Sequence, residues 1–121
     1  MHIPRKYPRF PVCLTAHVTT ADSGKEFFGS LEMVSRSGAG LSTPDRIPGG
    51  TALFLEIEAD DPAGDSKWYL SGTVRNLSKW GESNLLGIEF DDEISRENDP
   101  SLDRYLTCLE NEFIRNEKWN A

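Results

Sequence analysis

Apolar and polar residues alternate through much of the chain before residue 91. An alternation with a period of two places one set of side chains on the buried face of a strand and the other set in solvent. In one such stretch Leu53, Leu55 and Ile57 would point inward, while Glu56 and Glu58 would point outward. This pattern, together with the turn signals between the segments, predicts strands at Pro11–Thr19, Glu26–Val34, Ala39–Ser42, Thr51–Ala59, Trp68–Leu77 and Asn84–Phe90.

Short connections separate these strands. Ala21–Lys25 has the composition of a turn, and Pro44–Gly50 is a loop that ends in two glycines. Polar links are expected at Asp60–Lys67 and Ser78–Ser83. Several short strands with turn signals between them favour an all-β fold, either an antiparallel barrel or a sandwich.

The period changes to that of a helix in the C-terminal part of the chain. Asp99 suits the N-cap position, and Pro100 suits the first helical position. An apolar stripe with steps of three and four residues follows, so we expect a helix over residues 99–118. The stripe consists of Leu102, Tyr105, Leu106, Leu109 and Phe113. This helix would cover one side or the mouth of a barrel, or it would dock on a partner.

Composition indicates a single domain. The chain has 121 residues, 37% of them hydrophobic, and has no apolar run long enough to span a membrane. Its start lacks the apolar segment of a signal peptide, so we expect a cytoplasmic protein without membrane insertion. Cys13 and Cys108 are then expected to be reduced packing residues. Together with His2 and His17 they show no ligand spacing, so no metal site is expected.

Charge is unevenly distributed along the chain. The formal net charge is −7, yet residues 1–11 carry only basic charges, whereas residues 89–121 contain ten acidic and four basic residues. A nucleic-acid polymer would be repelled by most of this surface, because affinity for a phosphate backbone is chiefly electrostatic. A small anion held by the basic N-terminal segment remains compatible with this distribution.

The basic segment at residues 5–9 reads RKYPR, and its three cations are Arg5, Lys6 and Arg9. Its proline and Pro11 favour an extended backbone, in which Arg5 and Arg9 point to the same side about 13 Å apart. Two guanidinium groups in this arrangement suit a planar, anionic ligand. We therefore expect residues 1–11 to form a flexible basic arm.

A second candidate stretch joins two predicted strands at residues 33–38, which read MVSRSG. Gly38 and the nearby Gly40 can adopt positive φ and would let a ligand approach the main chain closely. Exposed N–H groups in such a turn form an anion-binding concavity, and the Ser35 hydroxyl adds a donor. An ordinary turned or bulged connection between strands explains the same residues.

Together the two stretches resemble the PilZ domain family of bacterial receptors for cyclic di-GMP (c-di-GMP). The family pattern is RxxxR followed, some 20 to 30 residues later, by (D/N)xSxxG. The chain matches it at Arg5, Arg9, Ser35 and Gly38, whereas Met33 occupies the position of the acid or amide.

The resemblance extends along nearly the whole chain. Residues 72–74 (GTV) and 86–90 (LGIEF) are similar to the closing strands of the family. The resemblance implies a six-stranded antiparallel β-barrel over residues 12–92, with the C-terminal helix at residues 99–118 packed on it. It also implies that the dinucleotide binds on the outside of the barrel.

The resemblance assigns roles to the candidate residues. Arg5 and Arg9 would clamp c-di-GMP, through guanine O6 and N7 or through phosphate. Ser35 would contact the ligand from the barrel wall, and Gly38 would allow close backbone approach. Met33 would occupy the position that accepts hydrogen bonds from guanine, which a thioether does poorly. Two further cations are possible helpers: Lys6 and Arg36.

Three functions compete at this point. The first is a c-di-GMP-binding signalling domain that passes the signal to an unidentified protein partner in motility, adhesion or biofilm control. The second is a PilZ-fold interaction module with weakened or lost nucleotide binding, which Met33 favours. The third is an oligonucleotide-binding barrel, which the acidic surface disfavours. No catalytic triad or metal cluster can be assembled from the sequence, so neither an enzyme nor a cofactor is expected.

Overall fold

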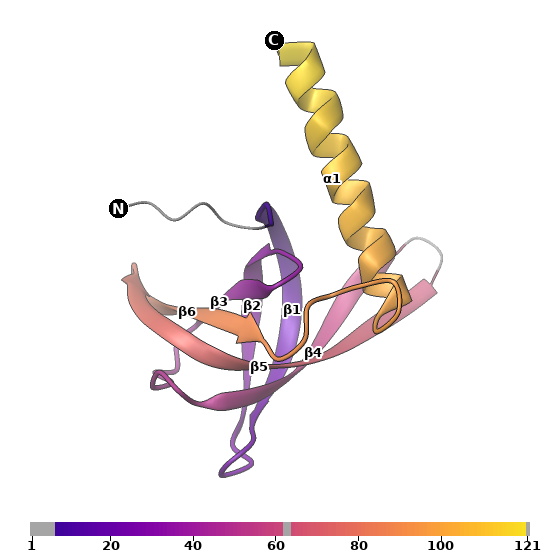
Figure 1. The fold of residues 1–121 in the computed structure, drawn as a ribbon. Coiled ribbons are helices and arrows are strands. Elements are labelled where there is room, and N and C mark those ends of the chain that lie inside the picture. The colour runs from indigo at the N-terminus through magenta and orange to yellow at the C-terminus, as the bar shows by residue number, and fades with distance from the viewer. Residues whose placement is uncertain (1–6, 62–63, 121) are drawn as a thin grey trace.

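The structure is a computed structural model that describes residues 7–61 and 64–120. In these residues a β-barrel is followed by a helix (Figure 1). The elements in chain order are β1 (Phe10–Thr20), β2 (Glu26–Val34), β3 (Gly38–Thr43), β4 (Ala52–Asp61), β5 (Gly64–Trp80), β6 (Ser83–Phe90) and α1 (Pro100–Asn120).

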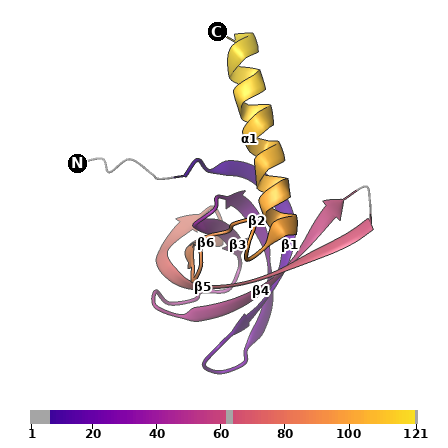
Figure 2. The same ribbon diagram turned by 45° about the vertical axis from the view of Figure 1, so that its right-hand side comes forward.

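The strands form a closed barrel in the order β1–β2–β3–β6–β5–β4, in which β4 also pairs with β1. All of these pairings are antiparallel, so the predicted barrel is confirmed and the sandwich is excluded. The predicted alternation is also confirmed, because Leu53, Leu55, Ile57, Leu86 and Ile88 are buried. In Figure 2 the strands curve around this shared interior.

Two segments predicted as polar links belong in part to strands. In the β4–β5 hairpin the ladder continues beyond Ala59, and Asp60 pairs with Asp65. β5 also extends to Trp80, and the chain turns at Gly81, where φ is 65°. A positive φ favours glycine, which has no Cβ. Backbone hydrogen bonds continue these strands beyond the apolar alternation, which does not report such bonds.

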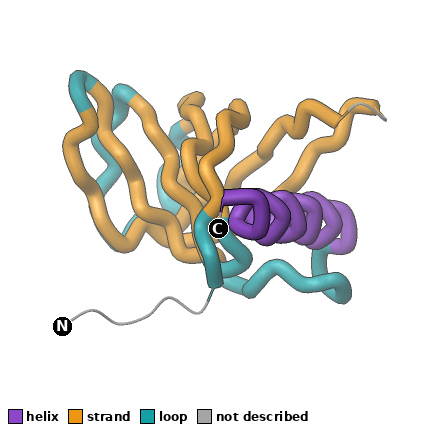
Figure 3. Tube along the Cα trace, turned by 90° about the horizontal axis from the view of Figure 1, so that it is seen from above, coloured by secondary structure: helices purple, strands orange, loops and turns teal. Residues whose placement is uncertain are grey.

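Helix α1 begins at the predicted cap. The Asp99 carboxylate accepts a hydrogen bond from the Leu102 N–H at 3.2 Å. Leu102 and Leu106 are buried in the barrel core, and Tyr105 packs on Trp68 with ring centroids 4.9 Å apart. The first turns thus pack on the barrel core. Figure 3 shows α1 beside the β4–β5 hairpin, and its later turns extend away from the barrel in Figures 1 and 2. The last residue of the predicted stripe, Phe113, lies outside the described side chains.

Within the described residues, no helix is long and apolar enough to cross a membrane. The two cysteines are free, as predicted, but they are not packing residues. Cys13 is exposed beside an irregularity in the pairing of β1 between Pro11 and Leu14. Cys108 is exposed because it lies off the apolar stripe of α1.

Candidate functional site

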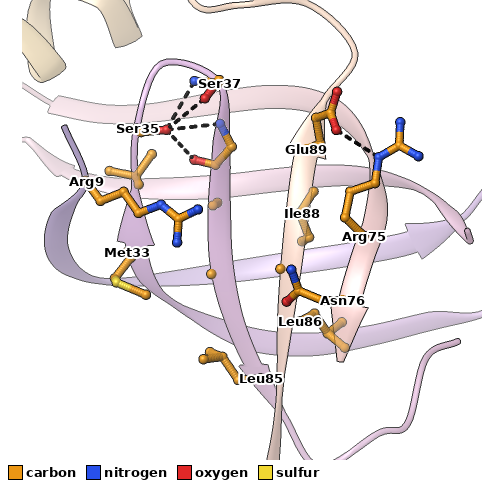
Figure 4. Close-up of a pocket in the computed structure, with 15 residues that line it drawn as sticks. Arg9, Met33, Ser35, Ser37, Arg75, Asn76, Leu85, Leu86, Ile88 and Glu89 are labelled. Atoms are coloured by element: carbon orange, nitrogen blue, oxygen red, sulfur yellow. Dashed lines mark hydrogen bonds and ion pairs between the residues drawn. The ribbon is translucent and has the colours of Figure 1, made fainter. Parts of the chain in front are cut away.

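A hollow of about 440 Å³ lies on the outer wall of the barrel, over β3, β6, β5 and the turn from β2 to β3 (Figure 4). Small-molecule sites typically have volumes of roughly 300–1,000 Å³. Four of the predicted ligand residues line this hollow, namely Arg9, Met33, Ser35 and Gly38. They come from the residue before β1, the end of β2, the turn and the start of β3.

Glycines form the floor of the hollow. Gly40 on β3 pairs with Gly87 on β6, and Gly38 pairs with Glu89. A Cβ on Gly38 would clash with the carbonyl oxygen of Ile88, a backbone atom of the neighbouring strand. The expected positive φ is absent at both Gly38 and Gly40. Glycine is required at residue 38 because two strands approach closely, and the floor of the hollow carries no side chains of its own at the glycine positions.

Two flexible side chains lie over this floor. The Met33 Cε atom is 3.4 Å from the point that a Cβ on Gly40 would occupy, and a Cβ on Gly87 would overlap the side-chain amide of Asn76. Met33 is half-buried and points into the hollow rather than into the barrel (Figure 4). Since both side chains end in flexible groups, a planar ligand can displace them or stack against them.

The Ser35 hydroxyl organises the turn at the edge of the hollow. Ser35 is buried, and its Oγ accepts hydrogen bonds from the N–H groups of Ser37 and Gly38, both at 3.2 Å. These bonds form part of the cluster of dashed lines in Figure 4. The two N–H groups are therefore satisfied within the turn, and the expectation of an open anion-binding concavity is wrong for them. Ser35 shapes the wall of the hollow.

Arg9 reaches the hollow because it directly precedes β1, which starts one residue earlier than predicted. The strand begins at Phe10, inside the predicted arm, and Phe10 pairs with Val34 at the end of β2. This pairing places Arg9 next to the β2–β3 turn, and Figure 4 shows its guanidinium pointing into the hollow. A delocalised cation thus stands at one side of the glycine floor.

The part of the arm that the structure describes contacts the segment before α1. The Tyr7 hydroxyl donates a hydrogen bond to the Glu93 carboxylate at 2.6 Å. The predicted clamp residue Arg5 and the predicted helper Lys6 lie outside the described residues. The flexibility of the arm and the role of these two residues stay predictions.

Sequence reasoning missed the wall that β5 and β6 contribute. Arg75, Asn76 and Glu89 line the hollow on the side away from Arg9 (Figure 4). Arg75 Nε donates to Glu89 Oε2 at 2.8 Å, and both side chains are 58% exposed. An exposed pair of this kind adds little stability, so Arg75 can exchange its partner for an anionic ligand. The pairing of β5 shifts between Val74 and Asn76, which hides the direction of Asn76 from any simple alternation.

Arg36 connects the turn to α1 and does not line the hollow. Its guanidinium donates to the carboxylates of Asp103 and Glu110 and to the Thr107 hydroxyl, the last at 3.1 Å. It also donates to the Ile94 carbonyl oxygen at 3.3 Å. Burial lowers the Arg36 pKa, but the hydrogen bonds and charges of the two carboxylates outweigh burial and raise the pKa overall. The residue predicted as a possible ligand helper instead ties the helix to the edge of the hollow.

The fold and the site define a class of protein: a closed antiparallel barrel with a hollow on its outer wall and a helix tied to the edge of that hollow. The family model described as PilZ domain matches residues 4–108. The chain belongs to the PilZ domain family. A comparison with curated proteins found no match.

Solved structures share this fold. The PilZ domain with c-di-GMP of YcgR from Escherichia coli has a TM-score of 0.69 at 17% identity, over 94% of this chain and 97% of that one. YcgR in complex with c-di-GMP, also from E. coli, has a TM-score of 0.73 at 17% identity, over 97% and 50% of the two chains. The Bacillus subtilis inhibitor of motility MotI/DgrA has a TM-score of 0.72 at 18% identity, over 93% and 53%. This chain therefore spans about half the length of the two longer proteins.

Proposed function

We propose that this PilZ domain is a receptor for c-di-GMP and that the ligand binds in the hollow on the outer wall of the barrel. The observation that carries this proposal is the convergence of Arg9, Met33, Ser35 and Gly38 on one hollow. Membership of the PilZ domain family supports the same ligand. The two YcgR structures, which have the same fold, contain c-di-GMP.

The hollow offers groups that suit a cyclic dinucleotide. Arg9 supplies a guanidinium for phosphate, or for O6 and N7 of guanine. The floor at Gly40 and Gly87 lets a flat base approach the main chain, and Met33 adds an apolar, polarisable contact. Arg75 is a second cation on the opposite side. Cations at two sides of a flat floor match a planar ligand with two phosphates.

Recognition of the guanine edge falls to residues other than Met33 in this proposal. The Asn76 amide carries both donors and an acceptor, and the Glu89 carboxylate accepts hydrogen bonds from guanine N–H groups. Arg5, carried by the arm, would fold back beside Arg9 when the ligand binds, and the arm would become ordered in the same step. The signal would then pass to a protein partner in motility, adhesion or biofilm control.

Met33 favours a second candidate function, a PilZ-fold interaction module with weakened or lost nucleotide binding. Its side chain covers Gly40 and takes up part of the floor that a base would use. It also replaces an acceptor of guanine N–H groups with a weak one. In this case the domain would act through its protein partner without the nucleotide.

Isothermal titration calorimetry of the purified chain separates these two functions. The chain is titrated with c-di-GMP, with cyclic di-AMP and GTP as controls for base and for ring closure. The receptor predicts saturable binding of c-di-GMP and weaker binding of both controls. No measurable binding of any of the three nucleotides would support the interaction module.

A further inference from the structure

Large aromatic side chains are exposed on a different part of the barrel wall, formed by β2, β1, β4 and β5. Phe28, Phe54 and Tyr69 expose 67%, 57% and 69% of their surfaces. The strand register places His17 opposite both Phe28 and Glu56, and Glu56 opposite Tyr69. These five residues are called the aromatic face below. Clustered exposed aromatic side chains mark interaction surfaces on soluble proteins more often than chance exposure does.

The aromatic face contains a hollow, and the side chains of His17 and Phe28 pack against each other within the face. A hollow of about 450 Å³ is lined by residues that include His17, Phe54, Glu56 and Tyr69. The His17 ring packs on Phe28 with centroids 4.9 Å apart. Phe54 and Tyr69 are diagonal neighbours across β4 and β5, and both side chains line the hollow. A side chain of moderate size can enter between them.

Negative charge dominates the surroundings of this face in the described part of the chain. Glu26, Glu56 and Glu58 bring three carboxylates, and Lys67 is 3.7 Å from Glu56. Glu26 and Glu56 also lie 3.3 Å and 3.7 Å from the two ring nitrogens of His17. A second copy of this chain, with its own net charge of −7, would be repelled. A cationic side chain would be attracted both by the carboxylates and by the aromatic rings.

We propose that the aromatic face docks a protein partner that presents arginine or lysine next to an apolar side chain. At this face β1 and β4 are each hydrogen-bonded to a neighbouring strand on both sides at His17 and Glu56, so a partner docking there would contact side chains on the outer wall. The apolar side chain would enter between Phe54 and Tyr69, and the cation would lie against their rings and Glu56. The aromatic face shares no residue with the hollow proposed for c-di-GMP, so this inference stands without that ligand.

A phage-displayed library of random short peptides tests the proposal on the full chain. Peptides are selected on the wild type and counter-selected on the double variant Phe54→Ser/Tyr69→Ser. The enriched peptides should combine arginine or lysine with apolar residues and lack acidic ones. Fluorescence anisotropy with the most enriched peptide should show a loss of affinity of about tenfold or more in the double variant, and weaker binding at high salt.

The matched control is Trp80→Ser, because Trp80 is 52% exposed but lies outside the aromatic face, at the far end of β5. It should bind the peptide as the wild type does, and all variants should keep the wild-type melting temperature. Enrichment of acidic peptides, no enrichment over the counter-selection, or an equal loss in Trp80→Ser would overturn the proposal. So would a dimer, seen by analytical ultracentrifugation, that the double variant abolishes.

Discussion

The outer wall of the barrel carries two contrasting surfaces. Over β3 and β6, the outward positions Gly40 and Gly87 lack side chains, and a hollow with cations at its sides results. Over β4 and β5, the outward positions carry Phe54 and Tyr69, with carboxylates around them. The inward side chains are buried beneath both surfaces. The two regions therefore share one core and differ in the side chains that point outward into solvent.

This difference indicates that the stability of the barrel and the character of its two outer surfaces depend on separate sets of positions. Inward residues supply the apolar area that stabilises the closed sheet. Where outward side chains are missing, a small flat ligand can reach the main chain. Where outward side chains are large and aromatic, they offer contact area that suits a macromolecular partner. Variants on each surface can thus be expected to change one function and leave the other intact.

Substitution of Arg36 should have the largest effect on stability, because it removes the hydrogen bonds between the β2–β3 turn, at the edge of the hollow, and α1. Arg36→Ala leaves the carboxylates of Asp103 and Glu110 without their partner, although their side chains are only 22% and 31% exposed. We expect the free energy of unfolding to fall by about 3–4 kcal/mol, measured by urea denaturation. Arg104→Ala, an exposed arginine on the same helix, should change it by less than about 0.5 kcal/mol. Equal effects of the two variants would contradict this role.

Arg9→Ala should weaken the binding of c-di-GMP in the hollow without destabilising the fold. Loss of a charge-assisted contact should weaken c-di-GMP binding by about 1.5–3 kcal/mol, and Arg5→Ala should do the same. Arg9 is exposed before β1, so the melting temperature should hardly change. Calorimetry would measure the affinity, with Arg46→Ala on an exposed loop as the control. If both arm variants bind as the wild type does, the arm is not part of the site.

Met33→Asp should increase the preference of the hollow for c-di-GMP over cyclic di-AMP. The carboxylate would accept hydrogen bonds from guanine N–H groups, so binding of c-di-GMP should tighten by about 1–2 kcal/mol relative to cyclic di-AMP. Met33 points into the outer hollow and not into the core, so stability should fall by no more than about 1 kcal/mol. Competitive calorimetry with the two dinucleotides gives the preference. An unchanged preference together with unchanged stability would refute the alignment of Met33 with the family's acid or amide.

Gly40→Ala should produce the smallest of these effects. The nearest atoms to a Cβ at this position belong to the side chains of Met33, at 3.4 Å and 3.8 Å, and Leu85, at 3.8 Å, so the barrel should tolerate it at a cost below about 1 kcal/mol. The methyl group would nevertheless occupy space above the backbone at the floor of the hollow, so the affinity for c-di-GMP should fall a few-fold. Thermal unfolding and calorimetry measure the two effects. Unchanged affinity would show that the ligand does not use the floor at Gly40.

The sequence predicted most of the barrel because one physical signal repeats along it. Apolar alternation, together with the turn signals between segments, located all six strands, and the cap at Asp99 located the start of α1. The strand ends were less accurate, since the ladder at Asp60 and Asp65 depends on backbone hydrogen bonds between polar residues. The exposure of Cys13 also differs from its prediction, because residue type alone does not give the direction of a side chain.

The candidate site was predictable only where residues follow a linear motif. Arg9, Met33 and Gly38 belong to the pattern that suggested the family, and the structure places them on one hollow. Asn76 reaches the same hollow because of the register of β5 with β6, and the shift in that register between Val74 and Asn76 could not be predicted from the sequence. The contacts of Arg36 join residues about 70 positions apart, so local periodicity could not reveal them.

Amide chemical-shift mapping tests most directly which of the two surfaces takes the nucleotide. Uniformly ¹⁵N-labelled protein is titrated with c-di-GMP, and each assigned backbone amide is followed by NMR. We predict the largest shifts at Ser37, Gly38 and Gly87 beside the hollow, and none beyond experimental error at Phe54 and Tyr69 on the aromatic face. Shifts centred on the aromatic face, or no shift near the glycine floor at saturating ligand, would contradict the assignment of c-di-GMP to the hollow.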